Sequence, residues 1–197
     1  MQVAQPVVGV LALQGAFAAH ELALAEAGAR PTQVRTPADL ARVDALVMPG
    51  GESTTMSKLL ETSGLFDEIK ARLSEGMPVF GTCAGMILLA TDVRDGRPDQ
   101  RSFGAIDIAV QRNGYGRQVD SFETDIHVEG EDVPFHAVFI RAPKVVSVGP
   151  AVEVLAVHED VPVLACQGAV MVASFHPELA GDARLHHRFL HHHLRRG

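Results

Sequence analysis

Short apolar runs alternate with helix-period segments in the first half of the chain. Each apolar run has the length of a strand buried on both faces of a parallel sheet. Such alternation predicts an α/β fold in three layers, with a mostly parallel central sheet and helices on both faces. The predicted strands are residues 7–13, 32–35 and 45–48, and the predicted helical segments are residues 16–27, which stop at Gly28, and residues 37–42.

The second half of the chain has a different pattern. Short apolar segments follow one another there, with turns but without long helices between them. This pattern predicts antiparallel strands that extend or cross the main sheet. The segments are residues 103–110, 121–128, 135–140 and 152–157, then a hairpin of residues 161–166 and 169–174. The polar, turn-rich residues 91–101 are expected to form a surface connection, and residues 182–194 to form a C-terminal helix.

Composition limits what this fold can belong to. The 197 residues, 47% of them hydrophobic, suit a single domain that spans residues 1–197. A formal net charge of −7 argues against a nucleic-acid surface, and no stretch approaches the roughly 20 apolar residues of a membrane span. Two widely separated cysteines and an N-terminus without a signal-like pattern favour a cytoplasmic location. We therefore expect a soluble, compact protein that binds neither nucleic acid nor membrane.

The segment Gly-Thr-Cys-Ala-Gly at residues 81–85 joins a short β-forming pair to a helix-period apolar stretch. This is the strand–turn–helix pattern of a nucleophile elbow, with Cys83 as the nucleophile. The glycines permit a tight turn that a Cβ would obstruct. At the start of the helix, the dipole and free N–H groups favour a thiolate, and the N–H of Ala84 could receive an oxyanion. The alternative is a buried cysteine in an ordinary strand-to-helix turn.

A second glycine-rich loop, Pro-Gly-Gly-Glu-Ser-Thr-Thr at residues 49–55, follows the predicted strand 45–48. Because the carboxyl ends of parallel strands meet at one edge of a sheet, this loop and the elbow can share one pocket. Its glycines let the backbone approach a ligand. One of the hydroxyl residues at positions 53–55 can cap a helix that begins near Met56. A turn with an N-cap, and no ligand, is the alternative interpretation.

Near the end of the chain, the predicted hairpin leads into Phe-His-Pro-Glu at residues 175–178. Residues two apart on an extended segment face the same way, so His176 and Glu178 can point into one site. A histidine held by a carboxylate is oriented to act as a general base, which makes a Cys–His–Glu set with Cys83 possible. Cys166 lies within an apolar strand without an elbow, and we expect it in the core.

Three further segments allow more than one interpretation. Residues 112–118, Arg-Asn-Gly-Tyr-Gly-Arg-Gln, could line a pocket or form an exposed hairpin loop. Arg141 follows the apolar residue Ile140, where its guanidinium could hold a carboxylate or remain a solvated edge charge. The C-terminal helix holds five histidines, and pairs four apart could bind a metal. Because no Cys or carboxylate accompanies them, a solvated histidine face is favoured and no metal site is expected.

Six motifs, in this order, closely resemble those of the class I, triad-type glutamine amidotransferases, and among these the glutaminase subunits of pyridoxal 5′-phosphate synthases. The resemblance covers nearly the whole chain, from about residue 7 to the C-terminal helix. Gly114 and the histidine-rich helix depart from the family pattern without touching the triad. The motifs are Leu-Gln-Gly at residues 13–15, the segments 49–55, 81–85 and 112–118, Phe-Ile-Arg-Ala-Pro at residues 139–143, and Ser-Phe-His-Pro-Glu at residues 174–178.

The resemblance implies an enzyme that hydrolyses L-glutamine to L-glutamate and ammonia. Cys83 would attack the side-chain amide carbon and form a γ-glutamyl thioester, His176 would transfer protons, and Glu178 would orient His176. The oxyanion would lie on the backbone N–H groups of Ala84 and of the glycine turn at residues 50–51, with Gly51 as the expected donor. No metal or organic cofactor would be needed. The glutamine would be held by Gly51, Glu52, Ser53, Arg112, Ile140 and Arg141.

The resemblance also implies a partner. The ammonia would pass to a separate synthase subunit, a (β/α)₈ barrel that builds pyridoxal 5′-phosphate, and the glutaminase would be weak until this partner docks. Gln14 and Gly15, at a strand end beside the site, are expected to form part of the switch. We further expect that the oxyanion turn is not formed in the free chain.

Three other functions fit parts of the pattern. The first is an amidotransferase subunit that serves a different ammonia acceptor. The second is a thiol hydrolase of γ-glutamyl peptides that is active alone. The third is a catalytically silent interaction module, which predicts the loss of a triad member, whereas Cys83, His176 and Glu178 are all present.

Overall fold

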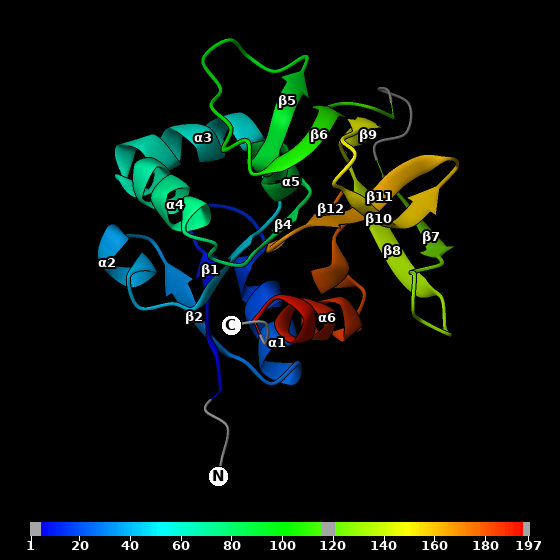
Figure 1. The fold of residues 1–197 in the computed structure, drawn as a ribbon, viewed down its shortest axis with the longest axis horizontal. Helices are drawn as coiled ribbons and strands as arrows, with labels where there is room; N and C mark the ends of the chain where they lie inside the picture. Colours follow the sequence, from blue (N-terminus) through cyan, green and yellow to red (C-terminus); the bar gives the residue numbers. More distant parts are fainter. Residues whose placement is uncertain (1–4, 116–120, 195–197) are drawn as a thin grey trace.

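The computed structural model describes residues 5–115 and 121–194, and these residues form a central sheet between two layers of helices (Figure 1). Its strands are β1 (Val7–Leu11), β2 (Arg30–Val34), β3 (Ala45–Met48), β4 (Val79–Thr82), β10 (Glu153–His158), β11 (Val161–Gln167) and β12 (Val170–Ala173). Their order is β10-β11-β12-β4-β3-β1-β2. The strands from β12 to β2 pair in parallel, whereas β10 and β11 extend one edge as antiparallel strands.

Helices cover both faces of this sheet. One face carries α2 (Pro37–Leu40), α3 (Ser53–Thr62), α4 (Leu65–Ser74) and α5 (Ala84–Leu89), and the other carries α1 (Phe17–Glu26) and α6 (Arg184–His193) (Figure 1). The side chains of β3 alternate between the two layers, because successive residues of a strand point to opposite faces. Leu46 and Met48 pack in the core with α3 and α4, and Ala45 and Val47 pack in the core with α1 and α6. The predicted three-layer α/β architecture is confirmed.

The second half of the chain differs from its prediction. Strands β5 (Ala90–Arg94), β6 (Ile106–Gln111) and β9 (Lys144–Val148) form one small sheet, and β7 (Ser121–Ile126) and β8 (Phe135–Ile140) form another. The expectation that the late strands extend or cross the main sheet was therefore confirmed for the hairpin and for β10, but it was wrong for the strands of the two small sheets. An apolar pattern shows that a strand is buried on one face, but it does not identify the neighbouring strand.

The expectation of a plain surface connection at residues 91–101 was also wrong in part. Residues of β5 pair in parallel with β6. Ala90 is buried, but Thr91 and Asp92 after it are exposed, which explains why the segment has the composition of a loop.

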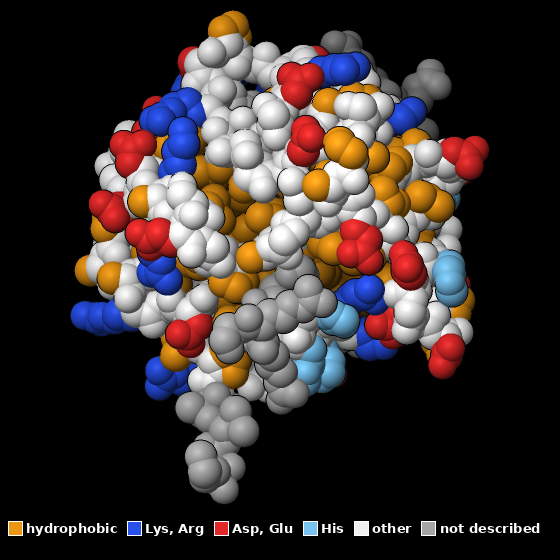
Figure 2. Space-filling view, viewed as in Figure 1, with side chains coloured by type: hydrophobic (Ala, Val, Ile, Leu, Met, Phe, Trp, Pro, Cys, Tyr) orange, Lys and Arg blue, Asp and Glu red, His pale blue; other side chains and the backbone are white. Residues whose placement is uncertain are grey.

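Helix α6 also corrects an expectation. Figure 2 shows histidine side chains gathered beside this helix, and His187 and His192 are exposed, as a solvated histidine face requires. His186 is instead fully buried, so the expectation was wrong for this residue. Histidines at successive positions of a helix point in directions about 100° apart, and one of them reaches the core. No described helix has the length and apolar character needed to cross a membrane.

Candidate active site

Cys83 lies where β4 passes into α5. Its backbone has φ +50° and ψ −107°, a conformation that non-glycine residues rarely adopt and that is common at functional sites. A Cβ on Gly85 would overlap the carbonyl oxygen of Met48, and a Cβ on Gly81 would lie 2.6 Å from Leu89 Cδ1. The two glycines therefore allow the turn to pack tightly against β3 and α5. The strand–turn–helix predicted around Cys83 is present.

His176 is held against the elbow by backbone hydrogen bonds on both sides. The N–H of Cys83 donates to the carbonyl of Ala173 at 2.8 Å, at the end of β12. Three residues after Ala173, the N–H of His176 donates to the carbonyl of Val138 in β8, also at 2.8 Å. The strand that hydrogen-bonds to the elbow thus continues directly to the histidine.

Glu178, in the short 3₁₀ helix η1 (Pro177–Leu179), lies behind His176. The Nδ1 of His176 is 2.8 Å from Glu178 Oε1, and the carboxylate side chain is fully buried. Burial disfavours a charged His176, but hydrogen bonds and opposite charges from Cys83 and Glu178 outweigh it and raise the pKa of His176 to about 10. The three predicted triad residues are therefore together, and their arrangement favours the imidazolium form of His176.

The loop at residues 49–55 lies against Cys83 and His176. A Cβ on Gly50 would overlap His176 Cε1 and lie 3.3 Å from Cys83 Cβ. The helix after the loop begins at Ser53, earlier than the expected start near Met56, and Glu52 caps it instead of a hydroxyl residue. The expected cap was wrong because one Glu52 carboxylate accepts hydrogen bonds from two backbone N–H groups, those of Thr54 at 2.9 Å and Thr55 at 2.8 Å.

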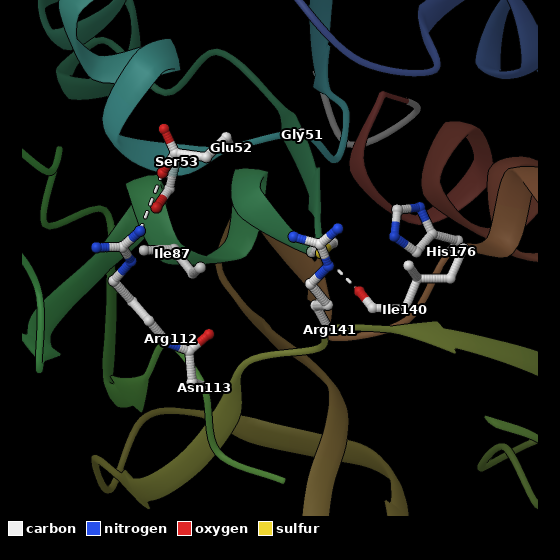
Figure 3. Close-up of a pocket in the computed structure, with 10 residues that line it drawn as sticks. Gly51, Glu52, Ser53, Ile87, Arg112, Asn113, Ile140, Arg141 and His176 are labelled. Atoms are coloured by element: carbon white, nitrogen blue, oxygen red, sulfur yellow. Dashed lines mark hydrogen bonds and ion pairs between the residues drawn. The ribbon is translucent and has the colours of Figure 1, made fainter. Parts of the chain in front are cut away.

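A cavity of about 420 Å³ opens in front of Cys83 and His176. Figure 3 shows Glu52 and Arg112 on one side of it, and Ile140, Arg141 and His176 on the other. Arg112 Nη2 lies 3.0 Å from Glu52 Oε1, and the thiol of Cys83 faces the Ile140 carbonyl at 3.8 Å. The cavity is lined by Gly51, Glu52, Ser53, Cys83, Ile87, Arg112, Asn113, Ile140, Arg141 and His176.

All the residues expected to hold glutamine line this cavity, and Ala84 follows Cys83 at the buried start of α5. Ile87 was missed as a lining residue, although its place one helical turn after Cys83 could have indicated it. Gln14 contacts the loop, since its Oε1 accepts a hydrogen bond from the N–H of Glu52 at 3.0 Å. The last part of the 112–118 motif, residues 116–118, lies outside the described residues.

Two other expectations concern cysteine and metal. Cys166 was expected in the core, but it is only half-buried near the end of β11, where it packs against the core from outside, with Sγ 3.5 Å from Glu153 Oε2. The prediction was wrong because β11 turns into the hairpin there, and its last two residues are less covered than its centre. Within residues 5–115 and 121–194, no group of three or more His, Cys, Asp or Glu side chains is arranged to hold a metal ion.

Comparison with known proteins gives consistent matches over the whole fold. "Pyridoxal 5′-phosphate synthase subunit PdxT" of Frankia alni is 54% identical over 186 residues, which are 94% of each chain. The protein of the same name from Mycolicibacterium vanbaalenii is 55% identical, over 94% of this chain and 96% of its own.

Solved structures agree. A crystal structure described as glutamine amidotransferase is 50% identical, with a TM-score of 0.88 over 93% of this chain and 97% of its own. PurLQS from Thermotoga maritima, 16% identical, has a TM-score of 0.66 over 98% of this chain and 99% of its own, and supports the fold alone. The model of the SNO glutamine amidotransferase family matches residues 10–195. The chain therefore belongs to the SNO glutamine amidotransferase family.

Proposed function

We propose that this chain hydrolyses L-glutamine and supplies the ammonia to a pyridoxal 5′-phosphate synthase. The observation that carries the proposal is the buried His176–Glu178 pair beside Cys83, at a cavity lined by two arginines and a carboxylate. The relatives named as subunits of this synthase share more than half of their residues with the chain and match it over nearly their full length. The fold alone would leave the ammonia acceptor open, because similar folds host different functions.

In the proposed mechanism, Cys83 Sγ gives its proton to His176 and attacks the side-chain amide carbon of glutamine. Glu178 stabilises the imidazolium that results, consistent with the raised pKa of His176. The tetrahedral oxyanion lies on the N–H groups of Ala84 and Gly51. His176 returns the proton to the departing ammonia, and water then cleaves the γ-glutamyl thioester to release glutamate.

The charges around the cavity suit a zwitterionic amino acid. Arg112 and Arg141 provide guanidinium groups for the α-carboxylate, a geometry that arginine matches well. Glu52 provides a negative charge that can face the α-ammonium group. Ser53, beside Glu52, and the backbone near Ile140, on the other side of the cavity, complete the polar contacts.

The ammonia acceptor is proposed to be a (β/α)₈-barrel synthase subunit that docks on this chain. Gln14 is a candidate for the switch that responds to docking, since its side chain already bonds the N–H of Glu52 in the loop beside the triad. We propose that the oxyanion turn at Gly50 and Gly51 reaches its active arrangement only in the complex, because a fully active free glutaminase would waste glutamine.

The test is the rate of glutamate release from glutamine, with and without the barrel subunit, for the wild-type chain and for Cys83→Ala. Strong activation by the partner that is lost in Cys83→Ala supports the proposal. Activity that the partner leaves unchanged favours a hydrolase that works alone or a different acceptor. Absence of activity in both conditions favours a silent interaction module.

A further inference from the structure

A second group of polar side chains lies buried behind the triad. His20 from α1 and His186 from α6 are both fully buried, although they are 166 positions apart, and Thr82 at the end of β4 is buried with them. His20 Nδ1 is 2.9 Å from His186 Nε2, and His20 Nε2 is 3.1 Å from Thr82 Oγ1. Buried polar groups are costly unless they have partners, so such a cluster needs a physical reason.

The cluster meets the triad at Glu178. One carboxylate oxygen, Oε1, lies within hydrogen-bond distance of His176 Nδ1. The other, Oε2, is buried and forms no well-directed hydrogen bond among the described residues, but His20 Nε2 lies 3.3 Å from it. Among the described residues, His20 is therefore the group whose ring nitrogen lies beside the second oxygen of the carboxylate.

The distances favour one arrangement of protons. If His20 carries its proton on Nε2, it donates toward Glu178 and Thr82, and Nδ1 accepts from the Nε2–H of His186. The unpartnered Nδ1 of His186 is then a bare lone pair. With the opposite tautomers, a lone pair of His20 would face the carboxylate, and His186 would bury an N–H donor without a partner, which is more costly.

Both histidines are neutral in this arrangement, as deep burial requires. Desolvation, with the charges of His186 and His176, holds the pKa of His20 well below 6.5. Desolvation alone lowers the pKa of His186 to about 4. A neutral His20 leaves the negative charge of Glu178 available to the His176 imidazolium.

On the basis of the proposed triad, we propose that His20 is a positioning residue of the glutaminase, whose Nε2–H, 3.3 Å from Glu178 Oε2, stabilises the second oxygen of the carboxylate electrostatically, and that His186 fixes the tautomer of His20. Each carboxylate oxygen of Glu178 then has an imidazole N–H nearby, that of His176 at Oε1 and that of His20 at Oε2. His20 acts through Glu178 and does not touch the substrate.

A matched pair of variants, His20→Gln and His20→Asn, separates a positioning role from a packing role. The amide nitrogen of glutamine reaches about as far as Nε2 of histidine, whereas that of asparagine reaches only as far as Nδ1. His20→Phe keeps the ring but removes both nitrogens. For the complex with the barrel subunit, we expect His20→Phe and His20→Asn to lower kcat about 10- to 100-fold with KM for glutamine unchanged, as for other residues that orient a catalytic group. His20→Gln should retain most of kcat.

The outcomes distinguish this inference from the proposed function. Full kcat in His20→Phe, or an equal loss in His20→Gln and His20→Asn with equally lowered melting temperatures, would overturn the positioning role. A Glu178→Gln variant with wild-type activity would overturn the proposed triad and this inference with it. An inactive Glu178→Gln beside an active His20→Phe would overturn this inference alone. ¹⁵N chemical shifts of the free chain should show the Nε2–H tautomer of His20, and the Nδ1–H tautomer would contradict the arrangement.

Discussion

Arg112 Nη2 and Glu52 Oε1 lie 3.0 Å apart, although the two residues are 60 positions apart in the chain. The same Glu52 carboxylate accepts hydrogen bonds from the first N–H groups of α3. One side chain thus caps a helix and holds an arginine of the cavity. A change at Glu52 should therefore be visible both in stability and in glutamine binding.

The first prediction concerns Glu52→Gln. Burial opposes the charge of Glu52, but hydrogen bonds from Thr55 and Thr54 outweigh it and lower its pKa from 4.5 to about 2. The folded state thus prefers the charged form, so the stabilisation is complete above pH 4.5 and is lost as the pH falls toward 2. Glu52→Gln should lower the free energy of unfolding at neutral pH by about 1 kcal/mol, as loss of a helix cap does.

Urea denaturation of the wild-type chain and of Glu52→Gln at pH 7 and pH 3.5 measures this effect. The difference in free energy of unfolding between the two chains should be smaller at pH 3.5. The KM for glutamine should also rise, because Arg112 loses its partner. Equal stability of the two chains at pH 7 would contradict the capping role.

The second prediction concerns Gly50→Ala. A Cβ at this position overlaps His176 Cε1 and approaches Cys83, so the variant should separate the proposed nucleophile from its base. We expect glutamate release to fall to background while the melting temperature changes little. Gly168→Ala is the control, since a Cβ added there meets nothing within 4 Å, in the turn between β11 and β12 at the far end of β12 from His176, and its activity should be normal. An active Gly50→Ala variant would show that the pair does not need this close approach.

The third prediction concerns the charge on His176. The carboxylate of Glu178 helps to raise the pKa of His176 to about 10, so Glu178→Gln should lower this pKa. Titration of the His176 ring followed by NMR measures the change directly. Glutamate release should fall roughly 100-fold or more, because the imidazolium loses both its stabilisation and its orientation. An unchanged titration would mean that Cys83 alone sets the pKa.

The fourth prediction concerns acid stability. The pKa of His186 is lowered to about 4 by burial, so below pH 6.5 the unfolded chain binds a proton that the folded chain does not. Stability should therefore decrease as the pH falls from 6.5 toward 4. His186→Phe should weaken this dependence between pH 6.5 and 4.5. Denaturation midpoints across this range provide the measurement, and a slope in His186→Phe equal to that of the wild type would refute the assignment.

Much of the site could be predicted from the sequence because its signals are local. The elbow around Cys83 depends on two glycines within two residues, and His176 and Glu178 are two residues apart. The cap at Glu52 was missed because a carboxylate and three hydroxyl residues compete at one helix start, and propensity alone does not rank them. The pairing of β5 with β6 was missed because β5 exposes most of its side chains.

By itself, the sequence determined the buried parallel strands, the order of the loops at their carboxyl ends and the residue types that meet there. Apolar spacing and glycine positions act through neighbouring residues, so these features can be recognised one segment at a time. Only the tertiary structure decided that His20 and His186 face each other behind Glu178, and that one histidine of a polar helix lies in the core. These contacts depend on how α1 and α6 pack on one face of the sheet, which no local pattern specifies.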